Sequence, residues 1–215
     1  MTADVSRVIR NTYAMLALTL IVSAVGAGLS MAVGMDHGMA IALVIAAFGV
    51  LLFVMPRVAN TGAGIWVVFA FTAMLGASLG PMLNYYLALP NGGSIVMQAL
   101  GGTAFVFLTL SAYVMVTGKN FSFLGGFLSI GILVVVFASL GTTVAAFFGV
   151  NVTGIELAVS AMTVLLMSGF ILYDTSRIIS GGETNYLMAT VSLYLDIHIL
   201  FTNLLQLIGA FSGDD

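Results

Sequence analysis

The chain has 215 residues, of which 61% are apolar and only 6% carry a formal charge, whereas soluble domains average about 25% charged residues. This composition excludes a soluble domain and is typical of a polytopic membrane protein. The five basic residues are too few to hold a nucleic-acid backbone, and a chain without cysteine has no disulfide and no thiolate nucleophile or metal ligand.

A spanning helix needs roughly 20 predominantly apolar residues, and the sequence divides into seven such runs separated by short polar or Gly/Pro breaks. In chain order the predicted helices cover residues 12 to 34, 38 to 55, 63 to 87, 94 to 116, 122 to 149, 153 to 178 and 186 to 211. The connections between them are too short to be domains. We therefore predict an all-α integral membrane protein, with an N-terminal tail at residues 1–11 and a single membrane domain at residues 12–215.

The basic residues all lie at one end of the predicted helices. They are Arg7, Arg10, Arg57, Lys119 and Arg177. By the positive-inside rule this end is cytoplasmic. The N-terminal tail is then cytosolic and, after seven crossings, the C-terminus with Asp214 and Asp215 is predicted to lie outside.

Small residues recur at helical spacings in several predicted spans. Examples are Gly76-x-x-x-Gly80 and the "GGFLSIG" run that starts at Gly125. Small residues let helix backbones approach closely in lipid, so the pattern predicts tight helix packing. Sliding or tilting of helices during gating is an alternative that the pattern also permits.

Two aspartates lie inside spans that are otherwise apolar, Asp174 in the sixth and Asp196 in the seventh. Each costs about 2.5 to 3.5 kcal/mol near a helix centre, so packing or function must offset them. The two helices are antiparallel neighbours, which places the aspartates about 12 and 20 Å from the connecting turn. They can therefore face each other if both point inward. Two carboxylates a few ångströms apart cannot both ionise cheaply, so such a pair would titrate as a unit and respond to protons.

An alternative exists for Asp174, which can bond to Arg177 three residues later or to the hydroxyls of Thr175 and Ser176. Asp196 lies more than two turns into its helix with no basic residue near it in sequence. It is therefore the strongest site candidate in the chain.

The segment "GFILYDTSRIISGGETNYLMATVSLYLDIHILF" combines an LYD and an LYLD element around a GGETNY turn. Together with "RNTYAMLALTL" near the N-terminus and "ASLGPMLNYYL" after the third span, it resembles the Bax inhibitor-1 family, most closely its bacterial YccA branch. The resemblance covers essentially the whole chain. It implies a bacterial inner-membrane protein in which six helices surround a central, C-terminal seventh helix.

The resemblance also implies a pH-sensitive leak of Ca²⁺ governed by a paired-aspartate sensor, which Asp174 and Asp196 match. In that family an arginine on the second helix latches one aspartate in the closed state. Arg57 is the first candidate for this latch, although its place beside Pro56 equally suits a positive-inside anchor, and Arg177 is the second. No cofactor is expected, with Ca²⁺ as the permeant ion. Two carboxylates alone would bind it weakly, because calcium prefers 6 to 8 oxygen ligands.

One departure from the family lies three residues after the seventh-helix aspartate, where an asparagine is common and this chain has Ile199. His198 and Asn203 are the candidates for polar support in its place. His198 lies about 200° around the helix from Asp196, so we expect a neutral histidine packed against another helix. A second proton sensor is the alternative.

The mechanism that we predict has ionised Asp174 engaging Arg57 and closing the cytosolic end at higher pH. Protonation of the pair loosens this latch and lets the second helix move. Full protonation also weakens the attraction for cations, so the leak is expected to pass through a maximum as the pH changes. The expected partners are membrane lipid, protons and Ca²⁺, and the sequence leaves the oligomeric state open, with a monomer compatible.

Two further functions compete with the channel. The YccA resemblance implies a membrane-embedded modulator of the membrane-bound AAA protease FtsH, engaged through the tail "MTADVSRVIR". Trimming this tail should abolish a tail-dependent interaction and spare a channel. The third hypothesis is an aspartyl intramembrane protease, because Tyr173-Asp174 and Asp196 are similar to its aspartates. That class expects Gly-x-Gly-Asp before the second aspartate, where this chain has "LYLD", so we do not expect an enzyme.

Overall fold

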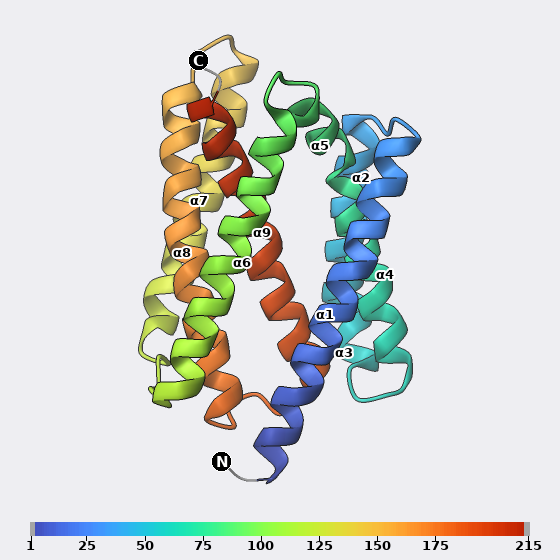
Figure 1. Cartoon of the computed structure of the whole chain (residues 1–215), viewed down its shortest axis with the longest axis vertical. Coiled ribbons are helices and arrows are strands. Elements are labelled where there is room, and N and C mark those ends of the chain that lie inside the picture. Colours follow the sequence, from blue (N-terminus) through green and yellow to red (C-terminus); the bar gives the residue numbers. More distant parts are fainter. Residues whose placement is uncertain (1–2, 213–215) are drawn as a thin grey trace. The chain divides into compact units, whose positions relative to one another are not determined.

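The computed structural model describes residues 3–212, and every regular element within them is helical (Figure 1). Asp214 and Asp215, which were predicted to lie outside, fall beyond the described residues. The elements are α1 (Ala3–Ala32), α2 (His37–Gly49), the π-helix η1 (Val50–Val54), α3 (Met55–Val58), α4 (Ala63–Ser78), α5 (Gly80–Leu87), α6 (Gly92–Thr117), α7 (Leu124–Phe147), α8 (Thr153–Ile179) and α9 (Tyr186–Ser212).

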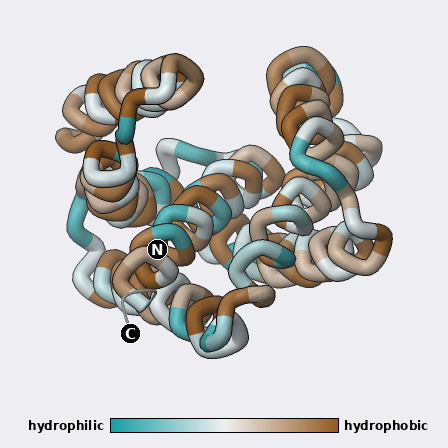
Figure 2. Tube along the Cα trace, turned by 90° about the horizontal axis from the view of Figure 1, so that it is seen from above, coloured by the Kyte–Doolittle hydropathy of each residue, from teal (hydrophilic) through white to brown (hydrophobic). Residues whose placement is uncertain are grey.

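Seven stretches of the described residues are long and apolar enough to cross a membrane, which confirms the all-α membrane class. They are Asp4–Ala32, His37–Val58, Ala63–Leu87, Gly92–Thr117, Leu124–Phe147, Thr153–Ile179 and Tyr186–Ser212. Figure 2 shows brown and pale helices interrupted by short hydrophilic stretches. The second span consists of α2, η1 and α3, and the third consists of α4 and α5.

The predicted limits agree with these spans to within a few residues, except at the start of the first. We expected a helix from residue 12, whereas α1 begins at Ala3. Residues 3 to 11 contain polar and charged residues throughout and so do not form an apolar run, but helix formation does not require apolarity. Asp4 suits the first turn of a helix, and Arg7 lies 3.7 Å from its carboxylate. The described part of the tail is therefore a helical extension of α1.

The second span is irregular because of Pro56. Proline has no N–H to donate back along the helix, and its ring clashes with the preceding turn. The chain adapts with the π-turn η1, in which the Met55 N–H donates to the carbonyl of Val50. The Arg57 guanidinium then donates to the carbonyl of Phe53, within the same irregular stretch.

The chain forms two compact units. Unit 1 comprises Met1–Pro90 and Gly181–Tyr194, and unit 2 comprises Asn91–Ser180 and Leu195–Asp215. Helix α9 thus contributes its first part to unit 1 and its remainder to unit 2. Each unit has its own mode of helix packing.

In unit 1, α1 packs along α4 with direct contact between backbones. A methyl group added at Gly76 would lie 2.2 Å from the carbonyl oxygen of Ser23, and one added at Gly26 would lie 2.8 Å from that of Ala73. These small residues let the two helices approach closely, as predicted from their spacing.

The first part of α9 is attached to α1 and α4 through Tyr194, which is only 1% exposed. Its hydroxyl lies 2.8 Å from Ser23 Oγ and donates to the carbonyl of Thr72 at 3.2 Å. Its ring meets that of Phe71 edge-on, with the centroids 6.0 Å apart. A buried tyrosine keeps its hydroxyl bonded in this way because an unpaired polar group would be costly in an apolar interior.

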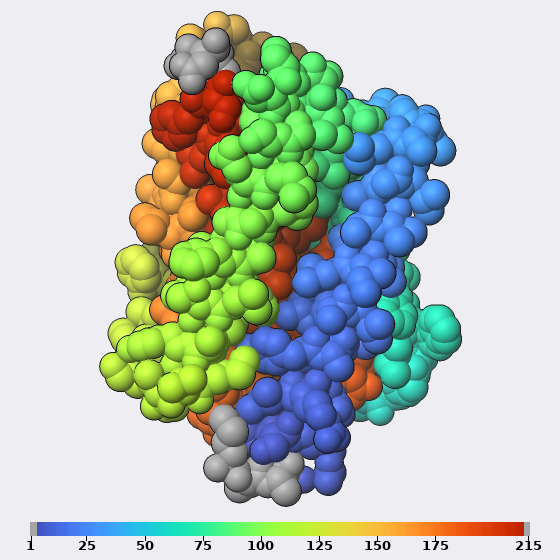
Figure 3. All heavy atoms as spheres, in the orientation of Figure 1, coloured from blue at the N-terminus to red at the C-terminus, as the bar shows by residue number. Residues whose placement is uncertain are grey.

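In unit 2, α7 and α8 pack glycines against large side chains. A methyl group at Gly131 of α7 would lie 2.5 Å from Cδ2 of Leu166, and one at Gly169 of α8 would lie 2.8 Å from Cδ2 of Leu128. Each helix therefore inserts a leucine at a glycine of the other, in antiparallel register. Helix α6 also packs against α8, and Figure 3 shows the last part of α9 between them.

Candidate functional site

Asp174 and Asp196 are buried together in unit 2, with exposed fractions of 8% and 5%. The two carboxyl groups lie close enough to interact electrostatically. Two carboxylates held so near each other cannot both ionise cheaply. Oδ2 of Asp196 is buried and has no hydrogen-bond partner among the described residues. The site is a pair of neighbouring, buried carboxyl groups inside an apolar helix bundle.

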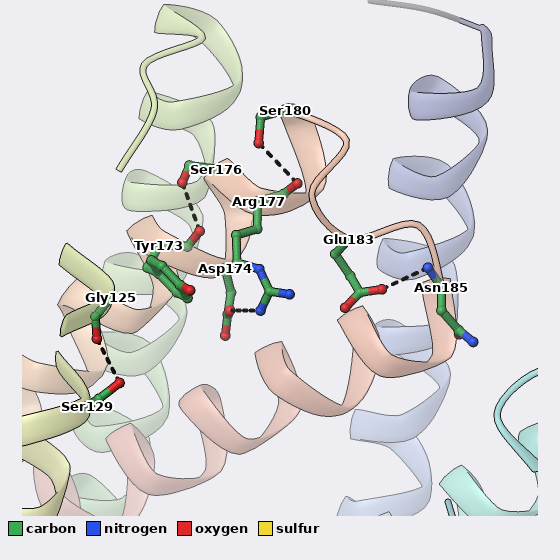
Figure 4. A network of polar contacts seen from close by, with 9 residues as sticks. All are labelled: Gly125, Ser129, Tyr173, Asp174, Ser176, Arg177, Ser180, Glu183 and Asn185. Carbon is green, nitrogen blue, oxygen red and sulfur yellow. Dashed lines mark hydrogen bonds and ion pairs between the residues drawn. The ribbon is translucent and has the colours of Figure 1, made fainter. Parts of the chain in front are cut away.

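Arg177 provides a positive charge beside Asp174 (Figure 4). Its Nη1 lies 3.8 Å from Oδ1 of Asp174, and its guanidinium lies over the ring of Tyr173, 5.6 Å from the centroid. Gly125 on α7 makes room for this ring, because a methyl group there would lie 3.0 Å from Tyr173 Cε2. Asp174 therefore has both neighbours that the sequence suggested as alternatives, Arg177 as an ion-pair partner and Asp196 as a second carboxyl group.

The two residues after Asp174 fix α8 on its other sides. The Thr175 hydroxyl lies 3.3 Å from Ser111 Oγ on α6, and Ser176 Oγ accepts the backbone N–H of Phe121 at 3.1 Å. Successive helical residues point about 100° apart, so these three side chains address different neighbours. The hydroxyls, which we had considered as partners of Asp174, instead anchor α8 to α6 and to the loop between α6 and α7.

The structure places Arg57 on α3 and both His198 and Asn203 on α9. Arg57 belongs to unit 1, is exposed and donates to its own helix at Phe53, so its role as a latch stays a prediction. His198 is half-buried on α9. The Asn203 amide donates to the carbonyl of Ile199 at 2.8 Å, within the same helix.

A second polar link between α8 and α9 was not identified from the sequence. Ser160 Oγ donates to Oε1 of Gln206 at 2.9 Å, and Ser160 is only 2% exposed. Polar residues at matching depths in two antiparallel spans were its only signal. No group of three or more His, Cys, Asp or Glu side chains that could hold a metal occurs in the described part of the chain. The carboxyl pair thus offers a cation few of the 6 to 8 oxygens that calcium prefers.

Comparison with known proteins decides the family. The family model described as "Inhibitor of apoptosis-promoting Bax1" matches residues 5–213. The chain belongs to this family. The resemblance noted in the sequence is thereby confirmed, and the Bax1-inhibitor family accounts for the chain over nearly its full length.

Relatives within the family are similar along their whole length. The modulator of FtsH protease YccA of Escherichia coli (strain K12) is 46% identical over 208 residues, covering 97% of this chain and 92% of YccA. The inner membrane protein YccA of E. coli O6:H1 matches equally well. A membrane protein of Vibrio cholerae is 45% identical over 214 residues, covering 100% of this chain and 94% of the relative.

Proposed function

We propose that this Bax1-inhibitor protein is a membrane-embedded modulator of a membrane-bound protease of the FtsH type. The observation that carries the proposal is the identity of 46% with YccA, which is named a modulator of FtsH protease, over 97% of the chain. The similarity includes the spans and the segments between them.

The helical extension of α1 supports a partner-binding role. Helix α1 has 30 residues and is about 45 Å long, whereas the hydrocarbon core of a bilayer is about 30 Å thick. The exposed side chains of the extension are Asp4, Ser6, Arg7 and Arg10. Its half-buried side chains are Val5, Val8, Ile9 and Asn11. The extension therefore presents a polar face on an ordered helix, which suits recognition by a soluble domain of a membrane protease.

Co-purification with FtsH tests this function. The full chain should be retained by tagged FtsH in detergent and should change the rate at which FtsH degrades a membrane substrate in proteoliposomes. Removal of residues 2–11 should abolish both effects, while residues 12 to 32 remain long enough to span the core. A full chain that is neither retained nor alters degradation would contradict the proposal.

The carboxyl pair favours a second function, a pH-sensitive leak of cations with Ca²⁺ as the ion carried. Two carboxyl groups in apolar helices represent a cost that a proton-dependent switch explains better than packing does. In this mechanism ionised Asp174 pairs with an arginine, Arg57 or Arg177, and closes the path at higher pH. Protonation weakens that pair and opens it. Weak, transient binding by two carboxylates suits conduction of Ca²⁺.

Flux measurements test the leak. Ca²⁺ influx into dye-loaded proteoliposomes should depend on pH between about 5 and 8, and Asp174→Asn and Asp196→Asn should flatten that dependence. Glu156→Gln is the matched control, because Glu156 is a half-buried carboxylate at the start of α8 and lies away from the pair. Arg57→Ala and Arg177→Ala separate the two candidate latches. Influx equal to that of empty liposomes at every pH would exclude the leak, and the variant lacking residues 2–11 should keep it.

A further inference from the structure

The turn between α8 and α9 contains a side chain that bonds in two directions. Oδ1 of Asn185 accepts the backbone N–H groups of Leu187 and Met188, at 2.9 and 3.3 Å, and so caps α9. Its Nδ2 donates to the carbonyl of Ala59 and to Oδ1 of Asn60, both at 2.9 Å. One amide thus joins the start of α9 to the loop that follows α3, and all these residues belong to unit 1.

Two other residues of the turn, Glu183 and Gly181, hold the Asn185 side chain in place. Oε1 of Glu183 accepts the backbone N–H of Asn185 at 2.9 Å (Figure 4), and Gly181 has a φ of +76°, which favours glycine. A helix cap requires only an acceptor, which serine supplies about as well as asparagine. The two bonds to Ala59 and Asn60 are therefore additional to capping.

The same junction is closely packed on its apolar side. A methyl group added at Gly64, in the first turn of α4, would lie 2.7 Å from the carbonyl oxygen of Val58 and 2.7 Å from Cδ1 of Leu187. Leu187 is 2% exposed. At Gly64 the end of α3, the start of α4 and the start of α9 are thus in close contact, so a displacement of one is transmitted to the others.

The two elements that Asn185 joins carry the two kinds of group in the proposed switch, an arginine latch and a carboxyl group. Arg57 lies in the last turn of α3, directly before the loop that Asn185 binds. Asp196 lies on α9, about 11 residues or 16 Å beyond Asn185. The π-turn η1 lies immediately before α3, and such turns are places where helix geometry adjusts.

We propose that Asn185 is a positioning residue that ties the end of α3, and with it Arg57, to α9, so that a change at the carboxyl pair moves the end of α3 as well. The inference rests on the carboxyl pair acting as a switch, and it adds the connection through which the second span would respond. Asn185 would act through the ends of the helices and would need no contact with an ion or with the carboxyl groups.

A double-mutant cycle tests the coupling. The chain has no cysteine, so Ala24→Cys on α1 and Thr61→Cys in the loop after α3 give two clean spin-label sites, both exposed and both in unit 1. We expect Asp196→Asn to shift the distance distribution between the labels in reconstituted protein. In an Asn185→Ser background, which keeps the cap of α9 and removes both donors, the shift should be lost.

Asn120→Ser is the matched control. Asn120 also accepts bonds within a turn, from the N–H and hydroxyl of Ser122, but lies in the loop between α6 and α7. It should leave the response to Asp196→Asn unchanged. An equal shift with and without the Asn185→Ser substitution overturns the proposal, as does the absence of any shift in the parent. Flux distinguishes the two failures: if Asp196→Asn flattens the pH dependence of the leak, the switch stands and only the coupling fails; if it changes neither flux nor distance, the switch fails as well.

Discussion

The two units use the same residue, glycine, to pack helices in opposite ways. In unit 1 the space at Gly76 and Gly26 is occupied by backbone atoms of the facing helix, whereas in unit 2 the space at Gly131 and Gly169 is occupied by ends of leucine side chains. A backbone atom of a helix cannot move without the rest of the helix, whereas a leucine side chain can change its rotamer. The α1–α4 contact of unit 1 is therefore made by atoms that do not adjust, and the α7–α8 contact of unit 2 by side chains that do.

The buried polar groups divide in the same way. Among the described residues, those of unit 1 are hydroxyls: Thr12, Thr19, Ser23, Ser30, Thr72 and Thr190. Unit 2 also contains the two buried carboxyls, Asp174 and Asp196. The groups whose charge can change thus lie in the unit whose helix contacts can adjust. A change of charge alters the bonds that a carboxyl group needs, so movable neighbours are an advantage around it.

The largest effect is expected at the backbone contact of unit 1. In Gly76→Ala the new methyl group would meet the Ser23 carbonyl at 2.2 Å, so α1 and α4 must separate. We expect a loss of about 3 kcal/mol in the free energy of unfolding, at the upper end for overpacking. Reversible unfolding in detergent micelles, followed by circular dichroism, measures it. Gly28→Ala on α1 is the control, since its methyl group meets nothing within 4 Å. Equal stability of the two variants would break the distinction between the units.

The second-largest loss of stability is expected when the hydroxyl of Tyr194 is removed. Tyr194→Phe keeps the ring and its contact with Phe71 but removes the bonds to Ser23 and Thr72. We expect a loss of about 1.5 kcal/mol, because buried groups are left without a partner. The same unfolding assay applies, with Tyr85→Phe as the control at a site that is 63% exposed. No loss in Tyr194→Phe would mean that packing alone fixes the first part of α9.

A smaller effect is expected for the same glycine substitution in unit 2. In Gly131→Ala the methyl group would lie 2.5 Å from Cδ2 of Leu166, which can rotate away. We expect a loss of about 1 kcal/mol, at the lower end for overpacking. Gly141→Ala on the same helix is the control, with nothing within 4 Å of its methyl group. A loss as large as that of Gly76→Ala would show that unit 2 is no more adjustable than unit 1.

The sequence predicted the spans well because their signal is simply apolar length. It missed the first nine residues of α1, where the helix continues through polar residues that no apolar criterion detects. It also singled out Asp174 and Asp196 as candidates, because a carboxylate in an apolar span is costly wherever it points.

The partners of these side chains depend on the rotation of each helix, which the sequence did not provide. Spans that are apolar on nearly every face have no polar side to mark the exterior. For this reason the anchoring of Thr175 and Ser176 and the link between Ser160 and Gln206 went unnoticed. Asn185 did have a local signal, as a capping residue before α9, but its bonds to Ala59 and Asn60 join segments far apart in the chain.

The smallest effect is expected for an exposed polar contact at the end of a span, between Lys119 and Tyr113. It tests whether burial determines how much a polar contact stabilises the protein. Lys119 Nζ donates to the Tyr113 hydroxyl at 3.0 Å, and this bond raises the pKa of Lys119 above its ordinary value. Tyr113→Phe keeps the ring beneath the ammonium and should lower that pKa, which the single lysine resonance of ¹³C-labelled protein reports during titration.

A raised lysine pKa stabilises the folded state below the unfolded pKa, and this contribution disappears as the pH rises through the folded value. Because the ammonium is fully exposed, water screens the bond and the unfolding temperature should not change. If Tyr113→Phe destabilised the protein as much as Tyr194→Phe, burial would not be the property that makes the Tyr194 hydroxyl important. Helix geometry, rather than burial, would then have to explain which polar contacts stabilise the fold.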